Sequence, residues 1–238
     1  MDISIVIPAY NERRRLPDNL SATFDYLEET FVTFEVIIVD DGSEDALGDY
    51  IDRLPKKYRR HVRYLAYHPN RGKGHAVRHG VLEAAGELIA YIDADGATPV
   101  AEMNRLLAAV RGGADVAAGS RAIGSPDTKV DKTIHRYLMG LTFTAIVRAF
   151  TGVSLSDTQC GFKLFTRKAA RDLFGALRTE GFAFDVELLA RAAARGYAVT
   201  EVAVNWHDVA GSKVNIIFDS LRMLGEVVRI SRMLKRGG

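Results

Sequence analysis

Two aspartates, Asp93 and Asp95, give the clearest chemical signal in the sequence. They follow the apolar run 88–92, which is typical of a buried strand, and are separated by a single alanine. Mg²⁺ or Mn²⁺ binds one or two carboxylates in such sites and completes its shell with phosphate and water oxygens. A metal held there would neutralise charge on a leaving diphosphate. The pair therefore predicts a metal–diphosphate site, and the alternative is a surface turn.

Three further polar clusters follow predicted strands. They are Pro8-Ala9-Tyr10-Asn11-Glu12, Asp40-Asp41-Gly42-Ser43 and Gly119-Ser120-Arg121. Each cluster alone could be turn or helix-cap chemistry. Ligands of parallel α/β sheets bind at the carboxyl ends of the strands, so several clusters at that edge together predict a binding site.

A basic, glycine-rich stretch, Arg71-Gly72-Lys73-Gly74, leads into a predicted helix. Backbone N–H groups in such a loop can approach a phosphate. The stretch lacks the spacing of a P-loop, and Val77 stands where a dinucleotide fingerprint would need a third glycine. A solvated loop remains the alternative.

The polar segment Asp157-Thr158-Gln159-Cys160-Gly161-Phe162-Lys163 lies within apolar sequence, and composition does not assign it a role. Cys160 is the one cysteine, which excludes an intrachain disulfide, favours a reducing, cytosolic setting and predicts a structural residue. The six histidines form no zinc-binding pattern. Trp206 could stack on a ligand or end a half-buried strand.

Short β-rich runs alternate with amphipathic stretches, which predicts a Rossmann-like, mostly parallel sheet flanked by helices. Near-continuous Ile and Val in the strands indicate burial on both faces of the sheet. Thr98 is the expected N-cap of the helix that begins at Pro99. The predicted strands are Ile3–Ala9, Glu35–Asp40, Val62–Ala66, Leu88–Asp93, Asp115–Ser120 and Val199–Trp206. The predicted helices are Leu16–Phe31, Asp45–Leu54, Lys73–Ala85, Pro99–Arg111, Lys132–Thr151, Thr166–Phe174, Phe184–Arg195 and Asn215–Lys235.

The 238 residues are 47% hydrophobic and 26% charged, which is ordinary globular composition. No apolar run reaches the ~20 residues that a spanning helix needs, and no signal peptide is expected. Residues 1–120 hold 14 Lys and Arg against 19 Asp and Glu, whereas residues 121–238 hold 18 against 11. An acidic half fits metal binding, and a basic half fits phosphates or an anionic surface.

We expect a catalytic domain over 1–212 and a basic amphipathic C-terminal helix over 213–238.

Two helical segments combine apolar and basic residues, 132–151 and 215–236. A basic amphipathic helix can lie in the membrane interface with its apolar face embedded. The alternatives are that both helices only close the core, or that they dock onto a small integral membrane protein or a second copy of this chain.

Three motifs resemble those of the inverting family 2 glycosyltransferases with the GT-A fold. They are Ile7-Pro8-Ala9-Tyr10-Asn11-Glu12, Val39-Asp40-Asp41-Gly42-Ser43 and Asp93-Ala94-Asp95. Within that family, the sequence is more similar to the polyprenyl-phosphate sugar synthases. Among these, it is most similar to the dolichyl-phosphate glucosyltransferase branch. The resemblance covers nearly the whole chain. The motifs that carry it to that branch are Arg71–Gly74, Asp93–Thr98, Asp157–Phe165, Phe182–Leu189, Val204–Trp206 and Gly211–Lys213.

The resemblance implies a role for each matching position. Asp93 and Asp95 would hold Mg²⁺ or Mn²⁺ with the diphosphate, Arg121 and Arg136 would bind phosphates, and Asp157 would lie beside the reacting centre. Asp95, Asp157, Arg121 and Arg136 are thus the expected catalytic residues. The expected substrate-binding residues are Pro8, Tyr10, Glu12, Ile38, Asp40, Lys73, Asp93, Ala94, Gln159 and Lys213, the last on a loop closing over the donor.

The resemblance implies transfer of a sugar from a nucleotide diphosphate sugar, with UDP-glucose favoured, to a polyprenyl or dolichyl phosphate with inversion. His207 stands where the mannose branch has an arginine, which weakens GDP-mannose as donor. GDP-mannose, UDP-N-acetylgalactosamine and UDP-glucuronate remain alternatives, and so does a non-catalytic nucleotide-binding subunit. Eukaryotic relatives have an N-terminal anchor, and we expect none in this sequence and peripheral attachment to the cytoplasmic face of a membrane instead. A homo-oligomer fits as well, and no nucleic-acid partner is expected.

Overall fold

The computed structural model describes residues 1–131, 134–209 and 216–235, with only the backbone for 134–139 and 216–221. Its centre is a seven-stranded sheet in the order β3-β2-β1-β4-β6-β5-β7. Neighbouring strands run parallel except for β6, which is antiparallel to both β4 and β5. The strands are β1 (Ile3–Ala9), β2 (Phe34–Asp40), β3 (Val62–Ala66), β4 (Leu88–Ile92), β5 (Val116–Ser120), β6 (Phe162–Thr166) and β7 (Val199–Ala203).

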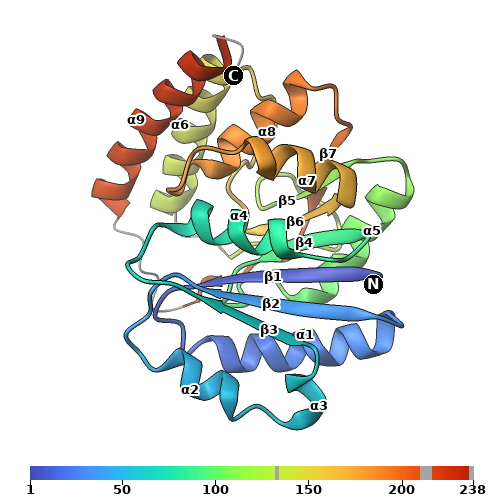
Figure 1. The fold of residues 1–238 in the computed structure, drawn as a ribbon. Helices are drawn as coiled ribbons and strands as arrows, with labels where there is room; N and C mark the ends of the chain where they lie inside the picture. Colours follow the sequence, from blue (N-terminus) through green and yellow to red (C-terminus); the bar gives the residue numbers. More distant parts are fainter. Residues whose placement is uncertain (132–133, 210–215, 236–238) are drawn as a thin grey trace.

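The helices form a layer on each face of the sheet (Figure 1). Helices α1 and α5 pack with the odd-numbered residues of β1, whereas α4, α7 and α8 cover the opposite face. A short 3-10 turn, Val100–Glu102, precedes α5. The helices are α1 (Leu16–Thr30), α2 (Leu47–Asp52), α3 (Lys56–Arg59), α4 (Lys73–Glu83), α5 (Met103–Arg111), α6 (Ile134–Thr151), α7 (Arg167–Ala176), α8 (Phe184–Ala194) and α9 (Ile216–Lys235).

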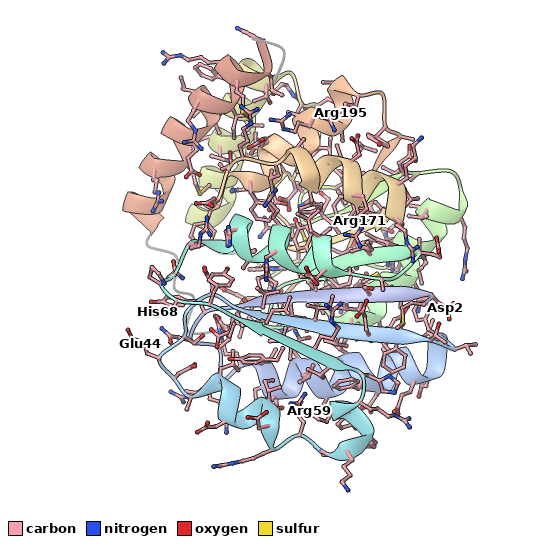
Figure 2. The ribbon with its side chains drawn as sticks, viewed as in Figure 1. Asp2, Glu44, Arg59, His68, Arg171 and Arg195 are labelled. Carbon is pink, nitrogen blue, oxygen red and sulfur yellow. The ribbon has the colours of Figure 1, made fainter. Side chains whose placement is uncertain are left out.

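The mostly parallel α/β architecture that the sequence predicts is confirmed. All seven residues of β1 and all seven of β2 are buried, as the unbroken apolar runs indicate. Side chains also join the helices within one layer: Arg171 of α7, labelled in Figure 2, donates to the carbonyl oxygens of Leu82 and Ala84 at the C-terminus of α4. These bonds satisfy carbonyls that have no partner within the helix.

Two local predictions are wrong for identifiable reasons, and one strand was missed. Helix α2 starts at Leu47 rather than Asp45, because Ala46 has a left-handed backbone with φ of 57°. Thr98 caps no helix, because Pro99 has an extended backbone with ψ of 138° and itself precedes the 3-10 turn, which begins at Val100. Strand β6 was not predicted at all.

The C-terminal helix packs on the same core as the catalytic fold. Val227 and Ile230 of α9 are fully buried with Val147 of α6, so these side chains are not available to a membrane. Arg229, Arg232 and Lys235 lie exposed on the other face of α9. Closure of the core thus accounts for the buried face. The predicted boundary at 212/213 lies outside the described residues.

Candidate active site

A cavity of about 500 Å³ lies at the carboxyl ends of β1 and β4. The loops after β1, β2 and β3 gather at this edge of the sheet (Figure 1), and Glu44 and His68 in Figure 2 mark two of them. The loop before α4, the turn before α8 and the first described turns of α9 complete the wall. The lining residues are Pro8, Ala9, Tyr10, Glu12, Arg15, Asp41, Asn70, Arg71, Gly72, Lys73, Ala76, Asp93, Ala94, Asp95, Gly181, Phe182, Arg222, Met223 and Glu226.

Asp93 forms an ion pair with a lysine inside this cavity. Its Oδ1 lies 2.5 Å from Nζ of Lys73, the first residue of α4. The backbone of Asp93 is fixed on both sides, because its N–H donates to the Gly161 carbonyl at 2.9 Å and its own carbonyl accepts from Asn19 at 2.9 Å. Burial opposes the charge of Lys73, but Asp93 together with Asp185 and Asp95 outweighs it, so the pKa of the lysine is raised. The ion pair thus favours the charged form of Lys73.

Asp95 is held less tightly. Its Oδ1 accepts the Ala97 N–H at 3.1 Å, and its Oδ2 lies 3.6 Å from Arg15, whose guanidinium pairs mainly with Glu12. Burial and the neighbouring charge of Asp93 raise the pKa of Asp95. The two aspartates thus place negative charge in the cavity that the protein neutralises only in part, which is the property of a cation site.

Asp41 organises the basic loop that the sequence singled out. Its carboxylate accepts the N–H groups of Arg71 and Gly72 at 2.7 and 2.8 Å and the Asn70 amide at 2.9 Å. Gly72 has φ of 105°, and a Cβ there would lie 2.6 Å from the Glu180 carbonyl oxygen, so only glycine fits. The carboxylate therefore shapes the loop that brings Lys73 to Asp93. The site prediction missed Asp41, although the Asp-Asp-Gly-Ser cluster at the end of β2 was its signal.

The structure brings seven of the predicted site residues into one cavity. Two other predicted site residues, Ile38 and Asp40, do not line it. Ile38 is fully buried in the core on the α1 face, so its side chain contacts no ligand in the cavity. Asp40 accepts the Ser43 N–H at 2.7 Å and the Tyr64 hydroxyl at 2.5 Å, which closes the turn after β2. The seven that line the cavity are Pro8, Tyr10, Glu12, Lys73, Asp93, Ala94 and Asp95.

Beside the cavity Arg121, partly buried, pairs with the buried carboxylate of Asp157. The guanidinium donates to both carboxylate oxygens at 2.7 and 2.9 Å, and the Arg121 N–H adds a third bond at 3.0 Å. Burial opposes both charges, yet the pairing raises the pKa of Arg121 and holds that of Asp157 well below its ordinary value. Trp206 has this guanidinium over its ring at 5.7 Å. The two residues do not line the cavity, and their catalytic roles remain predictions.

The segment that follows Asp157 connects the buried pair to Asp93. Gly161 lies against the Asp93 carboxylate so closely that a Cβ would overlap it. Gln159 reaches the other wall of the cavity, where its amide lies 3.8 Å from the sulfur of Met223. Of the remaining predicted site residues, Lys213 and the side chain of Arg136 lie outside the described residues.

Lys163 fixes this segment from within the core, a role that the sequence reasoning missed. Its ammonium is fully buried and donates to the carbonyls of Thr158 and Cys160, at 3.1 and 2.7 Å, and to Asp185 and the Tyr91 hydroxyl, both at 2.9 Å. Tyr91 is in β4, two residues before Asp93. The lysine thus fixes the 158–160 backbone against the strand that leads into the two aspartates.

Helix α9 supplies one wall of the cavity, which the sequence also did not indicate. Arg222, Met223 and Glu226 line it. Glu226 accepts the Ala183 N–H at 3.2 Å, and Arg222 lies 3.7 Å from the same carboxylate. The basic helix is therefore part of the site as well as a candidate surface for other contacts.

The residues present fit a hard divalent cation that arrives with a phosphate ligand. Across the described residues, no group of three or more His, Cys, Asp or Glu side chains gathers as a closed metal site. Two carboxylates with oxygen ligands, open to a cavity, match the chemistry of Mg²⁺ or Mn²⁺ that keeps several positions for phosphate and water.

Comparison with known proteins identifies the family of the chain. The family model described as "Glycosyl transferase family 2" matches residues 4–174, and the chain belongs to that family. It is 40% identical over 235 residues to a dolichyl-phosphate beta-glucosyltransferase of Drosophila melanogaster, covering 94% of this chain and 72% of that protein. The human protein of the same name is 37% identical over 233 residues, covering 93% and 72%.

Among solved structures, glucosyl-3-phosphoglycerate synthase from Mycobacterium tuberculosis in complex with UDP superposes with a TM-score of 0.69. The two chains share 18% sequence identity, and the match covers 97% of this chain and 78% of that one. The similarity confirms the GT-A fold that the sequence predicts. The chain is thus a glycosyltransferase of the family that the N-terminal and Asp-Ala-Asp motifs resemble.

Proposed function

We propose that the chain transfers glucose from UDP-glucose to a polyprenyl or dolichyl phosphate, with inversion at the anomeric carbon. The observation that carries the proposal is the cavity in which Asp93 and Asp95 face Lys73 at the carboxyl edge of the sheet. The acceptor and the sugar follow from the dolichyl-phosphate beta-glucosyltransferases of fly and human. The uridine nucleotide is supported by the UDP-bound structure with the same fold.

Asp93 and Asp95 would hold Mg²⁺ or Mn²⁺ at the diphosphate. When bound, such a cation supplies positive charge that stabilises the leaving diphosphate. Pro8, Tyr10 and Glu12 line the cavity at the end of β1 and would contact the nucleoside. Tyr10 is 40% exposed, and its aromatic ring could stack on a base.

The acceptor needs little activation from the protein. A phosphomonoester has its second pKa near ~6, so its oxygen is already anionic at neutral pH. Asp157, whose carboxylate is committed to Arg121, is then a positioning residue for Arg121 and the 158–161 segment rather than a proton acceptor. Rate enhancement would come from positioning and from charge stabilisation of the leaving group.

Attachment to a membrane would use the outer face of α9, on the cytoplasmic side. In the described residues no helix has the length and apolar character to cross a bilayer. Arg229, Arg232 and Lys235 lie exposed along α9, and Leu141 and Phe150 of α6, which packs against α9, are 50% and 45% exposed. Each cation near an anionic leaflet contributes about 1 kcal/mol.

A liposome experiment tests this attachment. The native chain should co-sediment with anionic vesicles at low salt, and the triple variant Arg229→Glu, Arg232→Glu and Lys235→Glu should remain in the supernatant. The three positions avoid the cavity, so turnover with a soluble, short-chain acceptor should persist in the variant. A native chain that stays in the supernatant would exclude direct surface binding and favour a membrane protein partner.

A donor screen tests the catalytic proposal. Purified protein is incubated with a short polyprenyl phosphate, Mn²⁺ and each of UDP-glucose, UDP-N-acetylgalactosamine, UDP-glucuronate and GDP-mannose. We expect a glycolipid product from UDP-glucose, with the β configuration by NMR. The Asp95→Asn variant serves as the inactive control. Product from another donor alone would refute the assignment of glucose, and no product from any donor would favour a non-catalytic role.

A further inference from the structure

Lys73 stands at a position that is unfavourable for a cation within its own helix. It is the first residue of α4, where the aligned peptide dipoles place partial positive charge. Burial also disfavours its charge. Among the described residues, its ion-pair partner is Asp93 at 2.5 Å. Local helix stability therefore does not account for this lysine, whereas the carboxylate opposite does.

The partner of Lys73 is one of the two carboxylates that a divalent cation would use. Asp93 cannot turn freely away from the lysine, because its carboxylate lies against Gly161 and its backbone is bonded to Gly161 and Asn19. The lysine ammonium and a metal ion would therefore compete for the same oxygen. Asp95 has no such competitor at short range, since Arg15 lies 3.6 Å away and is shared with Glu12.

The net charge of the residues that line the cavity indicates which ligands can bind together. The lining holds four cationic and five anionic side chains, so a divalent cation alone reverses its net sign, whereas a cation with a diphosphate does not. Lys73 displaced from Asp93 would need a new anion, and the diphosphate is the one that enters the same cavity. The cationic lining residues are Arg15, Arg71, Lys73 and Arg222, and the anionic ones are Glu12, Asp41, Asp93, Asp95 and Glu226.

We propose that Lys73 is an internal counter-cation that occupies Asp93 until the donor arrives, and that metal and nucleotide diphosphate therefore bind together. Lys73 moves from the Asp93 carboxylate to the diphosphate as the metal takes the carboxylate. The free protein consequently binds divalent metal weakly. The inference rests on the proposed function for its diphosphate ligand. The part that concerns metal affinity of the free protein does not depend on which sugar or base the donor carries.

Substitution of Lys73 by methionine tests the exchange, because it should change two affinities in opposite directions. Without nucleotide, Lys73→Met should bind Mn²⁺ about tenfold more tightly than the native chain, measured by electron paramagnetic resonance of free Mn²⁺, because a competing charge is gone. With saturating Mn²⁺, the same variant should bind UDP about tenfold more weakly in calorimetry, because a phosphate contact is lost.

Two controls isolate the effect. Lys73→Arg keeps the positive charge and should bind Mn²⁺ as weakly as the native chain. Lys168→Met removes a lysine exposed on α7, away from the cavity, and should leave both affinities within twofold. Thermal melting and circular dichroism confirm that each variant is folded.

The proposal is overturned if folded Lys73→Met binds Mn²⁺ no more tightly than the native chain, or if Lys73→Arg gains affinity as Lys73→Met does. A tighter Mn²⁺ affinity with unchanged UDP affinity would refute the second half, in which the lysine moves to the diphosphate. Failure of the native chain to bind any uridine nucleotide would refute the proposed donor instead. The Mn²⁺ affinities measured without nucleotide would still decide the role of Lys73.

Discussion

Replacement of Asp157 by asparagine removes one charge from the buried pair with Arg121. Asparagine keeps a single acceptor oxygen and presents an amide N–H₂ where the second carboxylate oxygen now accepts from the guanidinium. Of the bonds at 2.7, 2.9 and 3.0 Å, at least one is lost, and the partly buried Arg121 guanidinium loses the carboxylate charge that faces it. Removing one partner of a buried ion pair costs about 3 kcal/mol or more. For a chain of this size that corresponds to a fall in Tm of about 6–12 °C.

The loss should depend on pH. The folded-state pKa of Asp157 lies well below the ordinary value of 3.8, because Arg121 stabilises the carboxylate. A carboxylate with a depressed folded pKa contributes stability that is complete above its unfolded pKa and is lost as the pH falls through the folded one. The difference between native chain and variant should therefore be full near neutral pH and shrink below about pH 4.

Urea unfolding at several pH values measures this difference, with Asp172→Asn as the matched control. Asp172 also pairs with an arginine, Arg195 at 2.7 Å, but the two side chains are 44% and 34% exposed. An exposed pair is worth about 0.5 kcal/mol, so the control should lose little. If the two variants unfold within about 1 kcal/mol of each other at neutral pH, the buried pair does not stabilise the fold as reasoned.

Three further outcomes follow from the site. Asp95→Asn should abolish turnover while the Tm stays near the native value, since it removes an anionic ligand from a hard cation; full activity of this variant in excess chelator would contradict the metal assignment. UDP should bind more tightly than GDP in calorimetry with Mn²⁺, and a preference for the guanine nucleotide would reverse the donor assignment. Gly161→Ala should weaken UDP binding in Mn²⁺ at least tenfold, because its Cβ overlaps the Asp93 carboxylate, and unchanged affinity would show that Asp93 is free to move.

The strands and helices that repeat a simple pattern were predictable from the sequence. Unbroken Ile and Val runs marked β1 and β2 to within a residue, and the strand ends placed Asp93 and Asp95 at the edge of the sheet. Strand β6 was missed because its sequence, Phe162–Thr166, interrupts apolar residues with Lys163, which would be unfavourable in the core without partners. Two of the four oxygens that accept from this lysine are carbonyls of the irregular segment just before β6, and the other two are side-chain oxygens of Tyr91 and Asp185, 72 and 22 positions away, which local sequence does not show.

What the sequence determined by itself was therefore the fold class, the family and three of the cavity carboxylates, Glu12, Asp93 and Asp95, because these depend on periodicity and on short motifs at strand ends. The tertiary structure decided which neighbours each charge has. It buried Ile38 in the core, gave Asp157 to Arg121, and placed Lys73 against Asp93. It also brought Glu226 into the cavity wall. Electrostatic interactions and packing act between residues close in space, and for these side chains the partners lie between 20 and more than 40 positions away along the chain.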